Sequence, residues 1–175
     1  LEAFRKKDLE VLYLADPVDE WVVNSLPDFD GKKFEAADAA DLDLGDDEVK
    51  LEGVTDENQE ERIELVSFLK KELEDRVADV KESNRLTDSP CVLVTPQGGM
   101  SQNMERLMQM ADREFAPTKR VLEVNPKHPV IVNLGHLLKG NRDSEKLKQW
   151  SHFLVDYVLL GEGKVDDPQR VTATL

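Results

Sequence analysis

The chain has 175 residues, of which 37 are acidic and 23 basic, and its formal net charge is −14 at pH 7. This acidic balance argues against nucleic acid and anionic membranes as partners, because both require a basic protein surface. The single cysteine excludes an internal disulfide and is typical of a reducing cytoplasm, and no apolar run approaches the roughly 20 residues of a membrane span. Because the chain begins Leu-Glu-Ala, without methionine or a signal-peptide pattern, we expect a fragment of a longer soluble protein.

The first part of the chain has the pattern of half an α/β unit. Residues 9–15 form a nearly continuous apolar run, which predicts a strand covered on both faces. A helix is then predicted to begin with Asp16 as N-cap and Pro17 at its first position, and to end at Pro27. A lone strand and helix need further strands, so we expect residues 1–49 to be the end of a preceding domain.

An acidic stretch follows a predicted turn and short strand at residues 29–34. Between residues 35 and 61 twelve side chains are acidic and only Lys50 is basic, which predicts a solvated linker or hinge. The segment from Asp41 to Glu52 resembles a calcium loop in spacing, but its glycine stands at the fifth position instead of the sixth. We therefore predict no metal site there.

The sequence predicts a second domain at residues 50–175, with a small mixed sheet and helices. The whole chain is assigned to the α+β class. Helices are expected at 56–77, 100–111, 129–140 and 143–160, and strands at 77–81, 91–94 and 120–124. The first of these helices is expected to bury a stripe formed by Ile63, Val66, Leu69, Leu73 and Val77, widened by Leu65 and Phe68.

No catalytic or metal-binding set can be assembled from the sequence. Cys91 follows Asp88 closely and lacks the electropositive surroundings of a reactive thiol, so we expect a small buried side chain. His128, His136 and His152 lie far apart without ligand spacing around them. An enzyme is therefore the weaker hypothesis, and neither a metal nor another cofactor is expected within this chain.

A methionine stripe stands out in the predicted helix at residues 100–111. Met100, Met104, Leu107 and Met108 recur at helical spacing and share one face. Such a face is either buried core or an adaptable binding surface, since methionine is flexible and polarizable. From the residues alone, ordinary core is the favoured interpretation.

The last two predicted helices carry more apolar surface than one small domain can cover. Only Asp156 is charged between Phe153 and Leu160, and Asp167-Pro168 predicts the start of a further helix. We predict a symmetric dimer closed by a four-helix bundle, whereas a monomeric helical hairpin would expose an apolar patch. The interface is assigned to Leu147, Trp150, Leu154, Tyr157, Val158, Val171 and Leu175.

Five motifs occur in order along essentially the whole chain. They are EVLYLADPVDEW at 10–21, FDGK at 29–32, RLTDSP at 85–90, SQNMERLM at 101–108 and LEVNPKH at 122–128. In these motifs the chain resembles the ninety-kilodalton heat-shock (Hsp90) chaperone family, in its bacterial, high-temperature protein G form. The resemblance covers the end of the family's middle domain and its C-terminal dimerisation domain.

The resemblance implies a homodimeric, cytoplasmic chaperone, driven by ATP and Mg²⁺, that binds unfolded or partly folded client proteins. It also implies that the nucleotide site lies in domains preceding this chain, so that no ATPase activity is expected here. An alternative is a purely structural dimerisation module without client contact. The client-contact positions implied by the resemblance are Glu20, Trp21, Asn24, Met100, Met104, Leu107 and Met108.

Overall fold

A small mixed sheet lies at the centre of the computed structural model, which describes residues 1–26, 28–40, 42, 44, 58–112, 115–165 and 169. The strands are β3 (Asp79–Glu82), β4 (Cys91–Val94) and β5 (Val121–Val124), in the order β3–β5–β4. β3 is parallel to the central strand β5, and β4 is antiparallel to it. The predicted mixed sheet and α+β class are therefore confirmed.

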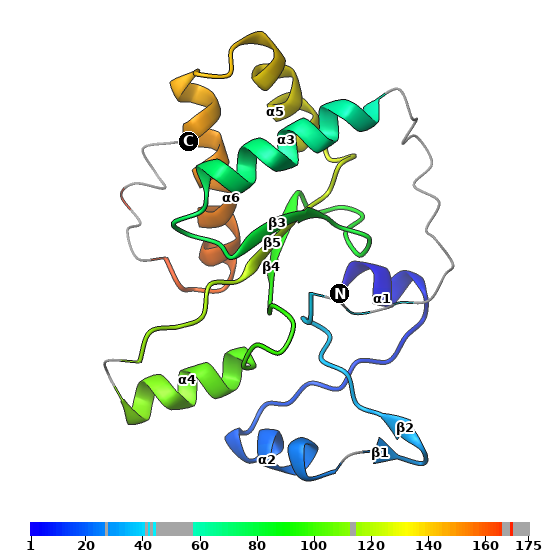
Figure 1. Cartoon of the computed structure of the whole chain (residues 1–175). Coiled ribbons are helices and arrows are strands. Elements are labelled where there is room, and N and C mark those ends of the chain that lie inside the picture. The colour runs from blue at the N-terminus through cyan, green and yellow to red at the C-terminus, as the bar shows by residue number, and fades with distance from the viewer. Residues whose placement is uncertain are drawn as a thin grey trace.

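Three helices cover one face of this sheet (Figure 1). They are α3 (Gln59–Glu72), α5 (Pro129–Gly140) and α6 (Glu145–Gly161). The core between helices and sheet is apolar, and Leu69, Leu122 and Leu154 are each at most 1 % exposed. Burying each such side chain contributes about 1.5–3 kcal/mol, so this layer supplies much of the stability of the fold.

The buried face of α3 agrees with the predicted stripe except at Ile63, which is 58 % exposed. Leu65, Phe68, Leu69, Leu73 and Val77 are buried, and Val66 packs partly buried against the core. The helix ends at Glu72 and not at Val77, so Leu73 and Val77 reach the core from the residues that follow it.

The N-terminal segment departs most from the sequence prediction. It contains α1 (Glu2–Lys6), α2 (Pro17–Ser25) and an antiparallel hairpin of β1 (Asp28–Phe29) and β2 (Lys32–Lys33), where a single strand was expected. Residues 9–15 form no strand, and Leu12 is 73 % exposed. A buried strand needs backbone partners and apolar cover on both faces, and the described part of the chain supplies neither to this segment.

The second face of the sheet is partly covered by residues 37–40, which were predicted to be solvated linker. Ala39 forms a parallel bridge with Thr95, and the backbone of Ala40 donates to the carbonyl of Thr95 at 2.8 Å. Ala40 packs with Val94 and Val121. The prediction failed here because composition averages over a long acidic stretch and misses small residues that fit closely against a sheet.

Three sequence predictions lie wholly or largely outside the described residues. These are the calcium-like spacing from Asp41 to Glu52, the domain boundary at residue 49 and the last helix after Asp167. The two-domain division therefore stays a prediction.

A loop at residues 85–89, which we call the joint loop, connects the N-terminal segment to the sheet. The Arg85 guanidinium donates to the carbonyls of Ala37 and Ala39 at 3.1 and 2.7 Å. On the other side, the Glu2 carboxylate accepts hydrogen bonds from the backbone N–H groups of Thr87, Asp88 and Ser89, at 2.6, 2.8 and 3.1 Å. The joint loop is therefore held by contacts with both α1 and residues 37–40.

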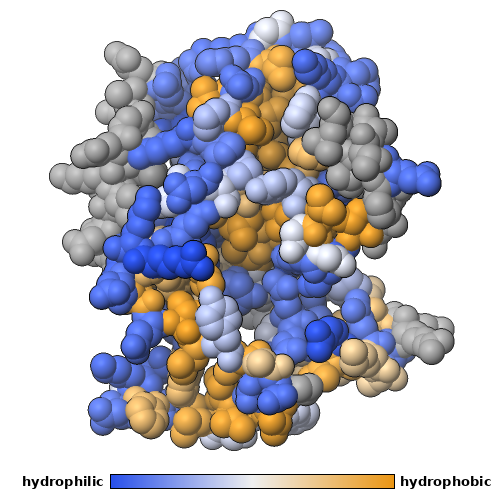
Figure 2. All heavy atoms as spheres, turned by 180° about the vertical axis from the view of Figure 1, so that it is seen from behind, coloured by the Kyte–Doolittle hydropathy of each residue, from blue (hydrophilic) through white to orange (hydrophobic). Residues whose placement is uncertain are grey.

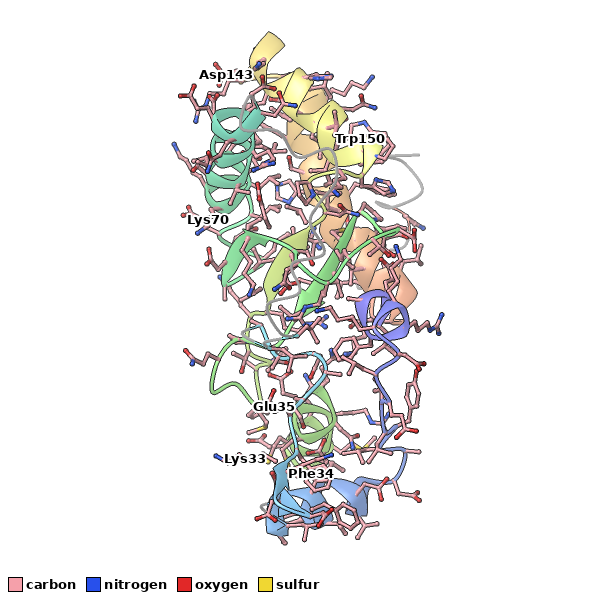
Figure 3. The ribbon with its side chains drawn as sticks, turned by 90° about the vertical axis from the view of Figure 1, so that its right-hand side faces the viewer. Lys33, Phe34, Glu35, Lys70, Asp143 and Trp150 are labelled. Atoms are coloured by element: carbon pink, nitrogen blue, oxygen red, sulfur yellow. The ribbon has the colours of Figure 1, made fainter. Side chains whose placement is uncertain are left out.

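These contacts position the N-terminal elements relative to the helical layer. In Figure 3, Asp143 and Trp150 lie at the end of the molecule formed by the helices, whereas Lys33 and Phe34 lie at the opposite end, near α2. One further helix, α4 (Gln102–Ala111), lies apart from the helical layer and beside α2, at the lower end of the molecule in Figure 1. The two helices that carry the predicted client-contact residues, apart from Met100 just before α4, are therefore neighbours.

Candidate functional site

A hydrogen-bonded serine joins α2 to α4. Ser101 is the N-cap of α4, and its Oγ accepts a hydrogen bond from the backbone N–H of Met104 at 3.2 Å. The same hydroxyl donates to Oε1 of Glu20 at 2.8 Å. A carboxylate is favoured near a helix N-terminus, because the unpaired N–H groups there carry partial positive charge. Glu20 therefore contributes to the packing of α2 against α4.

The methionine stripe lies on the surface. No residue of α4 is buried, Met104 and Leu107 are half-buried, and Met100 and Met108 are 37 % and 38 % exposed. The interpretation of this stripe as ordinary core is therefore wrong. It was favoured because helical spacing shows that a face is apolar, but not what covers it.

The neighbouring helix α2 is exposed as well. Trp21 is 64 % exposed, and Asn24 is also exposed. Figure 2 shows apolar side chains gathered over the lower end of the molecule, where α2 lies. We call the surface formed by Glu20, Trp21, Asn24 and the methionine stripe the α2–α4 surface. Exposed apolar groups gathered in this way are typical of interaction sites.

Sequence reasoning missed several residues near this surface. Val18 and Val22 of α2 and Met110 of α4 are more than half exposed, although none of them was assigned to the site. Met110 falls outside the helical spacing of the stripe, and no sequence pattern singled out the two valines as exposed. Ser101 could have been found from its position before the helix, which is a preferred place for an N-cap serine.

The approach to α4 is a defined turn. Gly98 has φ of +69°, and the backbone N–H of Gly99 donates to the carbonyl of Pro96 at 2.8 Å. A Cβ atom at Gly99 would lie only 2.9 Å from that same carbonyl oxygen. Both glycines are therefore required by the turn that brings α4 beside α2.

The residues assigned to a dimer interface are divided by the structure. Leu147 and Leu154 are at most 1 % exposed and lie in the core of the single chain. They are corrected to core residues, because both side chains pack into the hydrophobic core of the single chain and not on the outer face of α6. Trp150 and Val158 are partly buried against that core, and Tyr157 is 44 % exposed. Val171 and Leu175 lie outside the described residues.

Among the residues that the structure describes, the titratable side chains discussed in the sequence analysis form no reactive centre. Cys91 is 3 % exposed, its Sγ lies 3.4 Å from the carbonyl of Leu154, and burial raises its pKa to about 12. His128 accepts a hydrogen bond from the backbone of Val130 at 3.2 Å and caps α5. Among the described residues no three His, Cys, Asp or Glu side chains come together to hold a metal, and no helix there could cross a membrane.

Comparisons with known proteins agree with the motifs. The family model described as Hsp90 protein matches residues 1–175. Proteins named Chaperone protein HtpG are similar to the chain, at 42% identity over 175 residues in Geobacter sulfurreducens and 41% over 175 residues in Geobacter metallireducens. A third, in Nitrosococcus oceani, is 42% identical over 174 residues.

The similarity covers nearly all of this chain and a minor part of each relative. The alignments span 98%, 98% and 96% of the chain, but 27%, 27% and 26% of the respective relatives. The chain thus corresponds to about a quarter of the length of these proteins, and the match of the family model extends over all its residues. The chain therefore belongs to the Hsp90 family and is of the bacterial HtpG type.

Proposed function

We propose that the chain is the C-terminal part of an ATP-dependent molecular chaperone, in which it binds unfolded or partly folded client proteins and forms a homodimer. The observation that carries this proposal is the exposed α2–α4 surface, in which the helix that carries the exposed Trp21 packs beside the helix that carries the methionines. ATP and Mg²⁺ would bind in parts of the protein outside this chain. The protein would act in the cytoplasm, because a single free thiol in the chain is typical of a reducing compartment.

Each part of the α2–α4 surface would have a different role in binding a client. Trp21 offers a large, rigid apolar side chain, which is the kind of group that dominates binding energies at interfaces. The methionines have flexible, polarizable side chains and can adapt to many client sequences. The exposed side chain of Asn24 can bond the client backbone, while Glu20 contributes one carboxylate oxygen to Ser101 and keeps the other for a backbone N–H.

Client binding is tested by changing Trp21 to serine. We expect affinity for a permanently unfolded protein, such as reduced and carboxymethylated α-lactalbumin, to fall by at least about tenfold, because truncating a central aromatic anchor typically costs more than about 1–2 kcal/mol. Phe29→Ser is the matched control, since Phe29 is 69 % exposed but lies on the hairpin. Equal affinities of wild type, variant and control would leave only the structural alternative, a dimerisation module without client contact.

Dimerisation would use the outer face of α6. Tyr157 and Leu160 are 44 % and 54 % exposed there, and the half-buried Trp150 and Val158 adjoin the core. Tyr157→Glu should give monomers at micromolar concentration in analytical sedimentation, because a charge would be buried without a partner. Ile63→Glu, at an exposed position of α3, is the control. Intact dimers of the Tyr157 variant would reject this interface.

A further inference from the structure

A concave surface lies on the other side of α4 from the methionine stripe. It is a groove of about 1020 Å³ between α4 and the sheet domain, and none of the four residues of the stripe lines it. Asn103 and Arg106 of α4 form one wall, and Leu159 of α6 belongs to the opposite wall. Its volume lies at the upper end of the range of small-molecule pockets, about 300–1,000 Å³, so a short polypeptide segment can fit.

The groove is basic in a strongly acidic chain. Five of the residues that line the groove are basic and one, Glu105, is acidic, whereas the whole chain has a net charge of −14. Glu105 accepts a hydrogen bond from the backbone of Thr118 at 2.9 Å and is therefore already used within the chain. The basic lining residues are Arg76, Arg106, Lys119, Arg120 and Lys164.

Three of the five cations are already paired within the chain. Arg76 lies 2.6 Å from a carboxylate oxygen of Asp156, and Arg120 and Lys164 lie 2.7 and 3.3 Å from carboxylate oxygens of Glu162. Arg106 and Lys119 are exposed, and no salt bridge joins either of them to a carboxylate among the residues that the structure describes. Lys119 Nζ donates one hydrogen bond, to the backbone carbonyl of Glu74 at 2.9 Å, and its ammonium keeps two further N–H groups. Both cations can therefore pair with carboxylates from another molecule.

Apolar side chains lie between the cations. Leu14, Leu93, Pro117, Leu159 and Val165 are among the lining residues, so the groove offers both apolar contact and positive charge. Its walls are connected: Lys164 Nζ donates to Oε1 of Gln102 at 2.9 Å, and Glu105 bonds Thr118 across the groove. These bonds hold α4 at a distance from the sheet domain and keep the groove open.

We propose that this groove binds polypeptide segments in which apolar side chains are flanked by acidic residues. The apolar side chains would contact the groove near Leu159, and the flanking carboxylates would pair with Arg106 and Lys119. The inference rests on the proposed function, since such a segment would belong to a client protein. It adds a preference for acidic segments, which the α2–α4 surface does not supply. The net charge of −14 would by itself favour basic segments, so this preference is the opposite one.

The test compares three fluorescent peptides that share one apolar centre and carry flanking glutamates, glutamines or lysines. Binding to the 175-residue chain is measured by fluorescence anisotropy at about 0.15 M salt, where charges more than about 8 Å apart are largely screened. The glutamate peptide should bind about fivefold more tightly than the lysine peptide, as expected for two exposed charge pairs. The double variant R106E/K119E should lose or invert this preference.

A matched control separates the groove from total charge. R142E/K146E introduces the same charge change at exposed positions away from the groove, and it should keep the preference for the glutamate peptide. Equal binding of the three peptides, tighter binding of the lysine peptide, or an equal effect of both double variants would overturn the inference while leaving client binding intact. Failure of all three peptides and of the unfolded protein to bind would overturn the proposed function as well.

Discussion

Arg85 is the residue whose replacement should loosen the joint loop most. Its side chain is 5 % exposed, and its Nε lies 3.0 Å from Oε2 of Glu123, which is 1 % exposed. The Nε–H does not point at that oxygen, so the contact is an ion pair and not a hydrogen bond. The guanidinium also donates to two backbone carbonyls of residues 37–40. In Arg85→Met, Glu123 would remain buried in the sheet without its main cation.

The expected cost is about 3–5 kcal/mol, the range found when one partner of a buried ion pair is removed. The cost should lie in the lower part of this range, because Glu123 keeps two contacts. Ser83 donates to it at 2.9 Å, and the Lys81 ammonium lies 3.4 Å away. A domain of this size has a total stability of about 5–15 kcal/mol. The variant should therefore fold, but with a large fraction of its stability lost.

The assay is urea unfolding of Arg85→Met, Glu123→Met and the double variant. Apolar residues of similar volume in place of both charges are often neutral, so the double variant should be more stable than Arg85→Met, with a coupling energy of at least about 1 kcal/mol. Native-state amide exchange should also be faster at Ala40 and Thr95, whose N–H groups bond residues 37–40 to the sheet. The control is Arg142→Met, whose partner Glu64 is exposed.

Two results would refute this reasoning. A loss below about 1 kcal/mol in Arg85→Met, similar to that of Arg142→Met, would mean that water or other cations compensate Glu123. Additive losses in the double variant would mean that Arg85 and Glu123 stabilise the fold independently of each other.

Three further predictions concern single side chains. Burial alone would raise the pKa of Glu2, but hydrogen bonds from Asp88, Ser89 and Thr87 outweigh it and lower the pKa from 4.5 to about 2. The contribution of Glu2, about 1 kcal/mol after allowance for solvent screening, should be present above about pH 4.5 and be lost as pH falls toward 2. Urea midpoints should thus fall more steeply with acid in wild type than in Glu2→Gln, and parallel curves would contradict the assignment. Ser101→Ala should speed amide exchange in α4 by about five- to thirtyfold, because it removes the cap and the bond to Glu20, whereas unchanged exchange would show that neither contact holds α4. Cys91 should react with a thiol reagent only after unfolding, and rapid labelling of the native chain would show that its surroundings open.

The sequence alone was sufficient for the elements whose signals are local. The apolar run at 91–94 and the His128-Pro129 start of α5 appear as expected, and α6 begins after Ser144, one of the two N-caps, Asp143 or Ser144, that the sequence offers. Each depends on side chains within a few residues of one another, such as a cap, a proline at the first helical turn or a short β-branched run. The family motifs are local in the same sense, and the comparisons confirmed the family.

The tertiary structure decided which apolar surfaces are covered. The spacing of Met100, Met104, Leu107 and Met108 is the same for a core helix and a surface helix, and only the packing of α4 beside α2 showed that this stripe is exposed. Likewise, Leu154 and Tyr157 lie three residues apart on one predicted stripe, yet the sheet covers the first and leaves the second exposed.

The basic groove and the joint loop could not have been found in the sequence. Arg106 and Lys119 are brought to one groove by α4 and the segment before β5, and Arg85 reaches residues that precede it by almost fifty positions. Periodicity and capping describe a chain within a few turns, whereas burial, charge pairing and concave shape depend on contacts between distant segments. The amino-acid pattern therefore determined the family and the elements with local signals, and long-range packing determined the N-terminal segment and which faces of the elements are exposed.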